Sequence, residues 1–343
     1  MALETGNSLT VVDLLARLGG AAAAAAAEAL RRLLAAGRDD EVLGELLRAG
    51  MAAPSVPDGI RMLVGAYGNL MRELALIPPL AAASFVDGLG RPSPLAAPPG
   101  SFEVDGRPVM LPARVRSASQ GSAHYVVSSS AVDEILQAKE EPFRAFEIFP
   151  GQTPLAIFMI DYRESDLGRY YELGVAFFVV PRGRIAVPGM SIRALPVNQE
   201  FTRRAGREIW GYPKTLMPHM EIAYADEEVH CTVDRRHDDV LSITVPRGGA
   251  AASRDIPLYS YTSRSGTRYC TRFIRSGREE SLMLRPEVRL RLGHEGSGHC
   301  LCRNANDPCI CNDLRRLGLP ASPAMSCWTE HMSGCFEAPT SLD

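Results

Sequence analysis

Lysine is almost absent from this chain of 343 residues. Lys139 and Lys214 are the only lysines among 37 basic residues, so 37 − 2 leaves 35 arginines. An arginine-rich and alanine-rich composition is typical of a GC-rich genome, which explains the shortage but not the lysine that remains at position 214. A lysine amine can lose its proton and attack a carbonyl, whereas a guanidinium stays charged. The retained lysine therefore indicates nucleophilic chemistry.

Strong net charge and long apolar runs are missing too. A formal net charge of −3 without any large basic cluster argues against a nucleic-acid partner. The run Ala21–Ala27 is too short to span a bilayer, so we expect no membrane partner. Glu4 and Asp13 stand where a signal peptide would carry positive charge. These absences predict a cytoplasmic protein.

Two common catalytic patterns are also missing. No glycine-rich phosphate loop is present, because Gly293–Gly298 has no lysine at the required spacing. No Ser/His/Asp or Cys/His nucleophile arrangement stands out. Lys214 is left as the principal candidate for covalent chemistry.

The chain divides at a segment rich in proline and glycine. Residues 1–87 are predicted as a small all-α region, with apolar residues at helical spacing, and we interpret it as a packed extension without chemistry. Residues 88–101 are predicted as a linker. Residues 102–338 contain short apolar runs between turn residues, which is typical of an antiparallel sheet or β-barrel. The predicted fold class is therefore α+β.

Several elements of the second region can be predicted individually. Leu155–Ile160 and Val175–Val180 are predicted strands, and His230–Val233 with Leu241–Val245 is predicted as a hairpin. Few helices are expected there: residues 131–139, 202–209 and 313–317.

The residues around Lys214 form a recognisable motif, Gly206-Arg207-Glu208-Ile209-Trp210-Gly211-Tyr212-Pro213-Lys214. It resembles the active-site stretch of the acetoacetate decarboxylase family, in which Gly-Arg-Glu leads into Tyr-Pro-Lys. About forty residues upstream, Tyr170-Tyr171-Glu172 resembles the Tyr-x-Glu segment of that family. The resemblance extends over residues 102–338.

The resemblance implies a fold, an activity and roles for several residues. It implies an antiparallel β-barrel, a homo-oligomer and a cofactor-independent carboxy-lyase that acts on a small keto acid. Lys214 would form the Schiff base and Glu172 would act as general acid and base. Four further residues are candidates for substrate binding: Trp210 and Tyr212 beside the lysine, and the arginines Arg207 and Arg116.

The chemistry explains why a lysine is needed. A primary amine converts a ketone into an iminium, which accepts the electron pair released with CO2 as an enamine. The amine must start neutral, and burial in an apolar pocket or a neighbouring cation favours that form. Activation of a lysine in this way is the established rationale for acetoacetate decarboxylase itself, so for this chain it is implied by the resemblance.

The chain departs from the family pattern at two positions. Thr215 stands where the family has a second lysine, so desolvation by neighbours such as Trp210 and Tyr212 must replace the missing cation. Gly121 falls where the family places an early arginine, and Arg114 or Arg116 in a shifted register is the substitute that we expect, with Arg116 as the candidate for substrate binding. Two alternatives follow: an aldolase or dehydratase that uses the same iminium, and a non-catalytic ligand-binding module.

A cysteine cluster is the remaining motif. It consists of two Cys-x-Cys pairs separated by six residues: Cys300, Cys302, Cys309 and Cys311. Four thiols at the ends of a turn could bind a structural zinc ion, although zinc ribbons prefer two residues between paired ligands. A redox or disulfide pair and unligated thiols are the alternatives.

Overall fold

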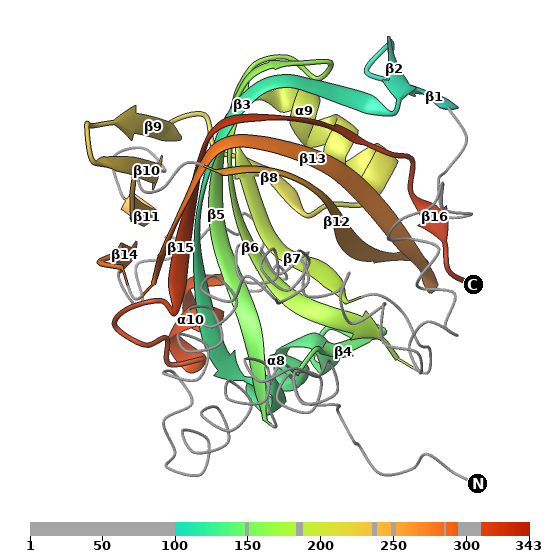
Figure 1. The fold of residues 1–343 in the computed structure, drawn as a ribbon. Coiled ribbons are helices and arrows are strands. Elements are labelled where there is room, and N and C mark those ends of the chain that lie inside the picture. The colour runs from blue at the N-terminus through green and yellow to red at the C-terminus, as the bar shows by residue number, and fades with distance from the viewer. Residues whose placement is uncertain are drawn as a thin grey trace, which may run out of the picture.

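In the computed structural model, the described residues are 100–147, 151–182, 188–234, 239–247, 252–284, 286–293 and 310–343. The predicted helical region 1–87 and linker residues 88–99 lie outside them. Gly100 and Ser101, which were expected in the linker, open the first strand. The described chain is mostly sheet with few helices, as expected for the second region (Figure 1). None of its helices has the length and apolar character needed to cross a membrane.

The elements follow one another along the chain in an order dominated by strands. They are β1 (Gly100–Val104), β2 (Arg107–Leu111), β3 (Ala113–Ser128), α8 (Ser129–Gln137), β4 (Phe143–Ala145), β5 (Gln152–Ser165), β6 (Tyr170–Pro181), β7 (Gly189–Val197), α9 (Glu200–Ala205), the π-helix η1 (Gly206–Trp210), β8 (Lys214–Leu216), β9 (Glu221–Tyr224), β10 (Glu228–Asp234), β11 (Asp239–Pro246), β12 (Ala252–Arg264), β13 (Thr267–Leu284), β14 (Arg289–Leu292), α10 (Ile310–Arg316), β15 (Met325–Phe336) and β16 (Thr340–Ser341).

The long strands form a closed circuit. The largest sheet runs in the order β4-β6-β5-β3-β15-β13-β12-β7-β8, and β6 also pairs with β7. Strands β6, β5, β3, β15, β13, β12 and β7 therefore return to their starting point. Figure 1 shows these strands curving around a common interior. A separate four-stranded sheet, β14-β11-β10-β9, contains the predicted hairpin as β10 and β11.

The expectation of a purely antiparallel sheet was wrong at two pairings. Strand β7 pairs in parallel with β12 and also with β8. The α9–η1 segment connects β7 to β8, and a crossover of this kind lets the second strand run in the same direction as the first. The parallel pairing places Lys214 opposite Leu195 of β7.

Alternation along the strands separates an inner from an outer set of side chains, because successive residues point to opposite faces. On β5, Ala156, Phe158 and Ile160 line the interior cavity, whereas Ile157 and Met159 between them do not. Both sets are buried. The near-continuous apolar run of this strand is explained by burial on both faces.

All three helices predicted within the described residues are present. The predicted helix 131–139 is α8, which Ser128 caps by accepting a hydrogen bond from the backbone N–H of Ala131. The predicted helix 202–209 spans α9 and η1, and the predicted helix 313–317 overlaps α10. Gly211 ends η1 with a φ of 74°, a left-handed conformation that glycine adopts without a steric penalty.

Gly174 provides a test of this packing. A Cβ added to it would lie 2.0–2.5 Å from ring atoms of Phe158, its direct cross-strand partner. We expect Gly174→Ala to lower the free energy of unfolding by about 1–3 kcal/mol, because the ring must shift in a packed interior. Thermal and denaturant unfolding measure the change. The double variant Gly174→Ala/Phe158→Leu should recover part of it, and no recovery would contradict the contact.

Candidate active site

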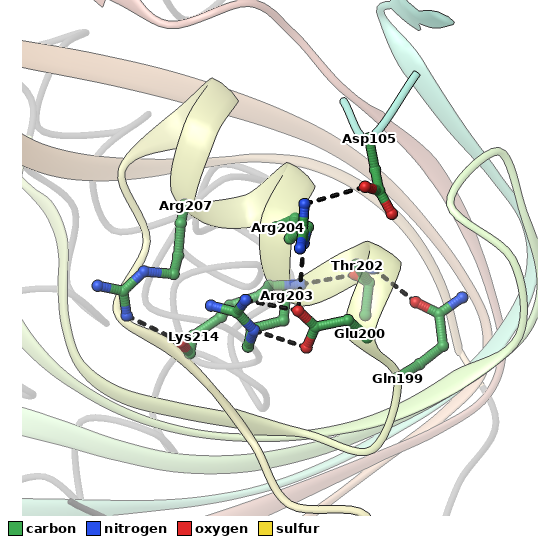
Figure 2. A network of polar contacts seen from close by, with 8 residues as sticks. All are labelled: Asp105, Gln199, Glu200, Thr202, Arg203, Arg204, Arg207 and Lys214. Carbon is green, nitrogen blue, oxygen red and sulfur yellow. Dashed lines mark hydrogen bonds and ion pairs between the residues drawn. The ribbon is translucent and has the colours of Figure 1, made fainter. Parts of the chain in front are cut away.

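Lys214 is held at the first position of β8. The left-handed turn at Gly211 and the rigid Pro213 precede it, and its backbone N–H donates to the carbonyl of Tyr212 at 2.7 Å. Its own carbonyl accepts a hydrogen bond from Nη1 of Arg207 at 3.1 Å (Figure 2). Both backbone groups are thus anchored beside η1, and only the side chain extends into the interior.

The Lys214 amine is enclosed by three groups. Its Nζ lies 2.8 Å from Oε2 of Glu172 and donates to Oγ1 of Thr202 at 3.0 Å. It also lies 4.9 Å from the centroid of the Tyr170 ring, within the range of a cation–π contact. The side chain is only 4% exposed. The amine is therefore positioned and shielded from bulk water.

Glu172 reaches the amine from β6. Alternation along that strand turns Tyr170 and Glu172 to the same inner face, and both line the cavity. The second carboxylate oxygen of Glu172 accepts a hydrogen bond from the hydroxyl of Tyr162 at 3.3 Å. Because the carboxylate contacts Nζ through one oxygen and a phenol through the other, its orientation is fixed.

The two phenols beside Glu172 stay protonated. Burial raises the pKa of Tyr162 and of Tyr170 well above the usual value, and the nearby charge of Glu172 raises both further. Their rings stack with centroids 4.3 Å apart. Tyr162 therefore serves as a hydrogen-bond donor to the carboxylate across the neutral pH range.

An interior cavity of about 120 Å³ lies in front of the amine. Most of the side chains that line it are apolar or aromatic, and the chain contributes them from every strand of the closed circuit. They include Phe158, Ile160, Leu167, Phe178, Met190, Ile192, Leu195, Leu258, Phe273 and Phe336. Such a site disfavours an isolated charge and strengthens each electrostatic contact made inside it.

Trp210 and Tyr212, two of the predicted substrate-binding residues, also line the cavity. The Trp210 indole N–H donates to the backbone carbonyl of Glu337 at 2.8 Å, and the Tyr212 hydroxyl lies 2.7 Å from Oγ of Ser260. Their rings stack with centroids 6.1 Å apart. Burial also raises the pKa of Tyr212, so this hydroxyl stays protonated.

The two predicted arginines lie elsewhere. Neither Arg207 nor Arg116 is among the residues that line the cavity. Arg207 is exposed on η1 and supports the backbone of Lys214. The Arg116 side chain is 47% exposed and pairs with Asp166 at 2.6 Å and Glu164 at 3.7 Å. The structure therefore does not bring these arginines to the amine, because the local alternation of β3 turns Arg116 outward.

Charged contacts fix the helix that carries Thr202. Figure 2 shows Arg203 and Arg204 converging on Glu200, with Arg204 also reaching Asp105 in the β1–β2 turn. The Arg203 guanidinium beside Glu200 lowers the pKa of that carboxyl to about 2. Gln199 caps α9 by accepting from the backbone N–H of Thr202. These contacts hold the Thr202 hydroxyl beneath the lysine amine.

Several cavity residues were not predicted. Tyr170 could have been, because it stands two residues before Glu172 in the Tyr170-Tyr171-Glu172 motif, and residues two apart share a face in any strand. Thr202 stands on a predicted helix, but nothing in the sequence indicates that it meets the amine. A polar group on the opposite wall, which contains Arg275 and Glu280, depends on strand register and carries no sequence signal.

The predicted cysteine site lies mostly outside the described residues, which include only Cys311 of its four cysteines. That residue is buried in α10. In the described ranges, no group of three or more histidine, cysteine, aspartate or glutamate side chains could hold a metal ion. The zinc site remains a prediction.

Comparison with known proteins agrees with the motif around Lys214. The family model described as acetoacetate decarboxylase matches residues 96–298, which is more than half of the chain. No curated protein matches the sequence significantly.

Solved structures with a similar arrangement include two acetoacetate decarboxylases. One is 16% identical, with a TM-score of 0.46, and the match covers 77% of this chain and 93% of that chain. The other, from Legionella pneumophila subsp. pneumophila str. Philadelphia 1, is 15% identical, with a TM-score of 0.47, covering 68% and 87%. The enduracididine biosynthesis enzyme MppR, complexed with the condensation product of pyruvate and imidazole 4-carboxaldehyde, is 11% identical, with a TM-score of 0.48, covering 72% and 98%.

Gly206 tests how tightly the amine is held. A Cβ on it would lie 2.5 Å from Cδ and 2.7 Å from Cε of Lys214. We expect Gly206→Ala to push the amine away from Glu172. In protein labelled with ¹³C-lysine, the Cε resonance of Lys214 should shift while that of Lys139 stays in place. Ala205→Gly, which perturbs the same helix by about 1 kcal/mol, is the control. An unmoved Lys214 resonance in the alanine variant would contradict the packing.

Proposed function

Because the chain belongs to the acetoacetate decarboxylase family, we propose that it is a lyase that decarboxylates a small β-keto acid through a Schiff base on Lys214. The observation that supports this most strongly is the buried amine, 4% exposed in a mainly apolar cavity and 2.8 Å from a carboxylate. Schiff-base chemistry of this kind needs no cofactor.

The reaction would begin with proton transfer from the Lys214 amine to Glu172, which the 2.8 Å contact allows. The neutral nitrogen attacks the ketone carbon and forms a carbinolamine. Glu172 returns its proton to the carbinolamine hydroxyl, which leaves as water, and the nitrogen lone pair completes the iminium. Tyr162 would hold the carboxylate in the correct orientation during both transfers.

Carbon–carbon cleavage would follow. The bond between the α-carbon and the substrate carboxylate breaks, its electron pair moves into the iminium, and CO2 leaves with an enamine still bound to Lys214. The α-carbon then takes up a proton that comes from solvent, which restores the iminium. Water adds to the restored iminium, and the ketone product leaves with the amine regenerated.

The surroundings of Lys214 favour this sequence. With Thr215 in place of a second lysine, no adjacent cation helps to neutralise the amine, so the task falls to burial and to Glu172 as proton acceptor. Trp210 and Tyr212 would form the wall against which the substrate packs. Arg207 would act on the position of Lys214 through its backbone carbonyl rather than by binding substrate.

The same iminium supports a second activity. An enamine formed on Lys214 can attack an aldehyde instead of taking up a proton, which gives an aldol condensation or, after loss of water, a dehydration. The position of Arg116 outside the cavity lining favours this alternative, because neither predicted arginine reaches the cavity to hold the carboxylate of acetoacetate. A non-catalytic ligand-binding module is the third alternative. We further propose a cytoplasmic homo-oligomer.

Borohydride trapping tests the Schiff base. We expect incubation with acetoacetate or pyruvate followed by reduction to leave an N-alkyl adduct, derived from the keto acid or its decarboxylated ketone, on the Lys214 peptide. The Lys139 peptide should stay unmodified and serves as the internal control. Lys214→Arg should abolish both the adduct and turnover, since a guanidinium cannot form the iminium. Unaltered turnover in that variant would remove Lys214 from the mechanism.

Glu172→Gln separates proton transfer from adduct formation. We expect turnover to fall about 10²–10⁴-fold, which is the usual contribution of a positioned acid or base. Release of ¹⁴CO2 measures decarboxylation, and mass spectrometry with an added aldehyde detects condensation products. Tyr224→Phe is the control. It removes a hydroxyl that donates a hydrogen bond to Asp161, and neither of these two residues lines the cavity. Equal rates for the wild type and Glu172→Gln would exclude the proposed role.

A further inference from the structure

A buried ion pair lies in the cavity wall away from Lys214. Arg275 and Glu280, both on β13, have side chains only 4% and 3% exposed, and both line the same cavity as the amine. Apolar residues of similar volume are often at least as stabilising as a buried ion pair. Stability alone therefore does not account for a charged pair inside this cavity.

Strand register places this pair opposite Glu172. Glu172 is paired with Ile160, Ile160 with Gln120, Gln120 with Thr329, and Thr329 with Glu280. Direct cross-strand partners share a face of the sheet, and all five residues line the cavity. The row crosses four strand boundaries of a circuit of seven strands, so its two ends lie on opposite walls.

Arg275 keeps part of its guanidinium uncommitted. Its Nε donates to Gln120 at 3.1 Å, and its Nη2 donates to both Glu280 and Thr329. Among the described residues, no acceptor takes a hydrogen bond from Nη1. The guanidinium is thus fixed by three side chains of the row while one NH2 group remains available to an acceptor in the cavity.

The backbone leaves room for that group. A Cβ on Gly277 would lie 3.0 Å from Nη1 of Arg275 and 2.6 Å from Oε1 of Glu280, so a larger residue there would require the pair to shift. Glu279 has a φ of 52°, which breaks the alternation of β13 and lets Glu280 join Arg275 on the inner face. The side chain of Glu279 itself points outward and is 63% exposed.

We infer that Arg275 binds an acceptor oxygen at the far end of the substrate, so that the substrate spans the cavity from Lys214 to Arg275. The inference rests on the proposed Schiff base. It identifies the substrate class as keto compounds that carry a carboxylate or similar oxygen group separated from the reacting carbonyl by an apolar segment. Phe158, Ile192 and Leu258 would pack against that segment.

A series of methyl ketones tests the span. Wild-type protein is incubated with 4-oxopentanoate, 5-oxohexanoate or 6-oxoheptanoate, each beside the ketone of equal length without a carboxylate, and then reduced. We expect adducts on Lys214, with at least one acid trapped about tenfold or more better than its matched ketone. Equal trapping of acid and ketone at every length would overturn the inference.

Removing the ion pair should abolish the preference for acids. In Arg275→Met/Glu280→Met both charges are lost together, so neither is left buried alone. We expect this variant to form adducts with the plain ketones while its acid preference disappears. Arg193→Met/Asp313→Met removes another buried pair, 4% and 10% exposed, that does not line the cavity, and should keep the preference. A preference retained without Arg275 would overturn its role.

Failure of the Schiff base gives a different result. If no ketone forms an adduct with the wild type, the proposed function fails, and Arg275 is then judged by calorimetric titration with the same acids and ketones. Tighter binding of an acid than of its matched ketone, lost in Arg275→Met/Glu280→Met, would still support the inference. Equal binding would overturn it.

Discussion

The contact between Lys214 and Glu172 is the interaction on which the rest of the site depends. A buried amine beside a buried carboxylate is costly to desolvate, so the surrounding structure must hold both groups in position. Thr202 and Tyr162 complete the hydrogen bonding of the pair, and each belongs to a different element. The charged contacts of α9 and the turn at Gly211 fix the positions of the elements that bring the amine to the carboxylate.

The closed circuit of strands explains how residues far apart in sequence meet. Each strand alternates between an inner and an outer face, and the register between strands aligns the inner residues into rows. One such row starts at Glu172 and ends at Glu280, more than one hundred residues later in the chain. Two clusters of charge thus face each other across an apolar interior, and a molecule that reacts at one cluster is within reach of the other.

Much of the reactive centre could be predicted from the sequence because its signals are local. The rarity of lysine, the Tyr212-Pro213-Lys214 segment and the upstream Glu172 point to one site, and the structure brings Lys214 and Glu172 together. Arg116 was predicted to bind substrate on the basis of a shifted register. That register depends on how β3 pairs with β5 and β15, which the sequence does not show. Arg275 is one of 35 arginines in the sequence, and its contacts with Gln120, Glu280 and Thr329 follow from strand register rather than from any local motif. The parallel pairings of β7 depend on a crossover that short strand patterns do not reveal.

Backbone hydrogen bonds between successive strands of the closed circuit fix the width of the interior that the strands enclose. Widening the interior would require breaking backbone hydrogen bonds between neighbouring strands, whereas exchanging an inward side chain breaks none of them. A scaffold of this kind diversifies by substitution within a constant frame. Substitution of single inward residues such as Phe158 or Leu258 would therefore reshape the cavity while the backbone position of Lys214 stays the same.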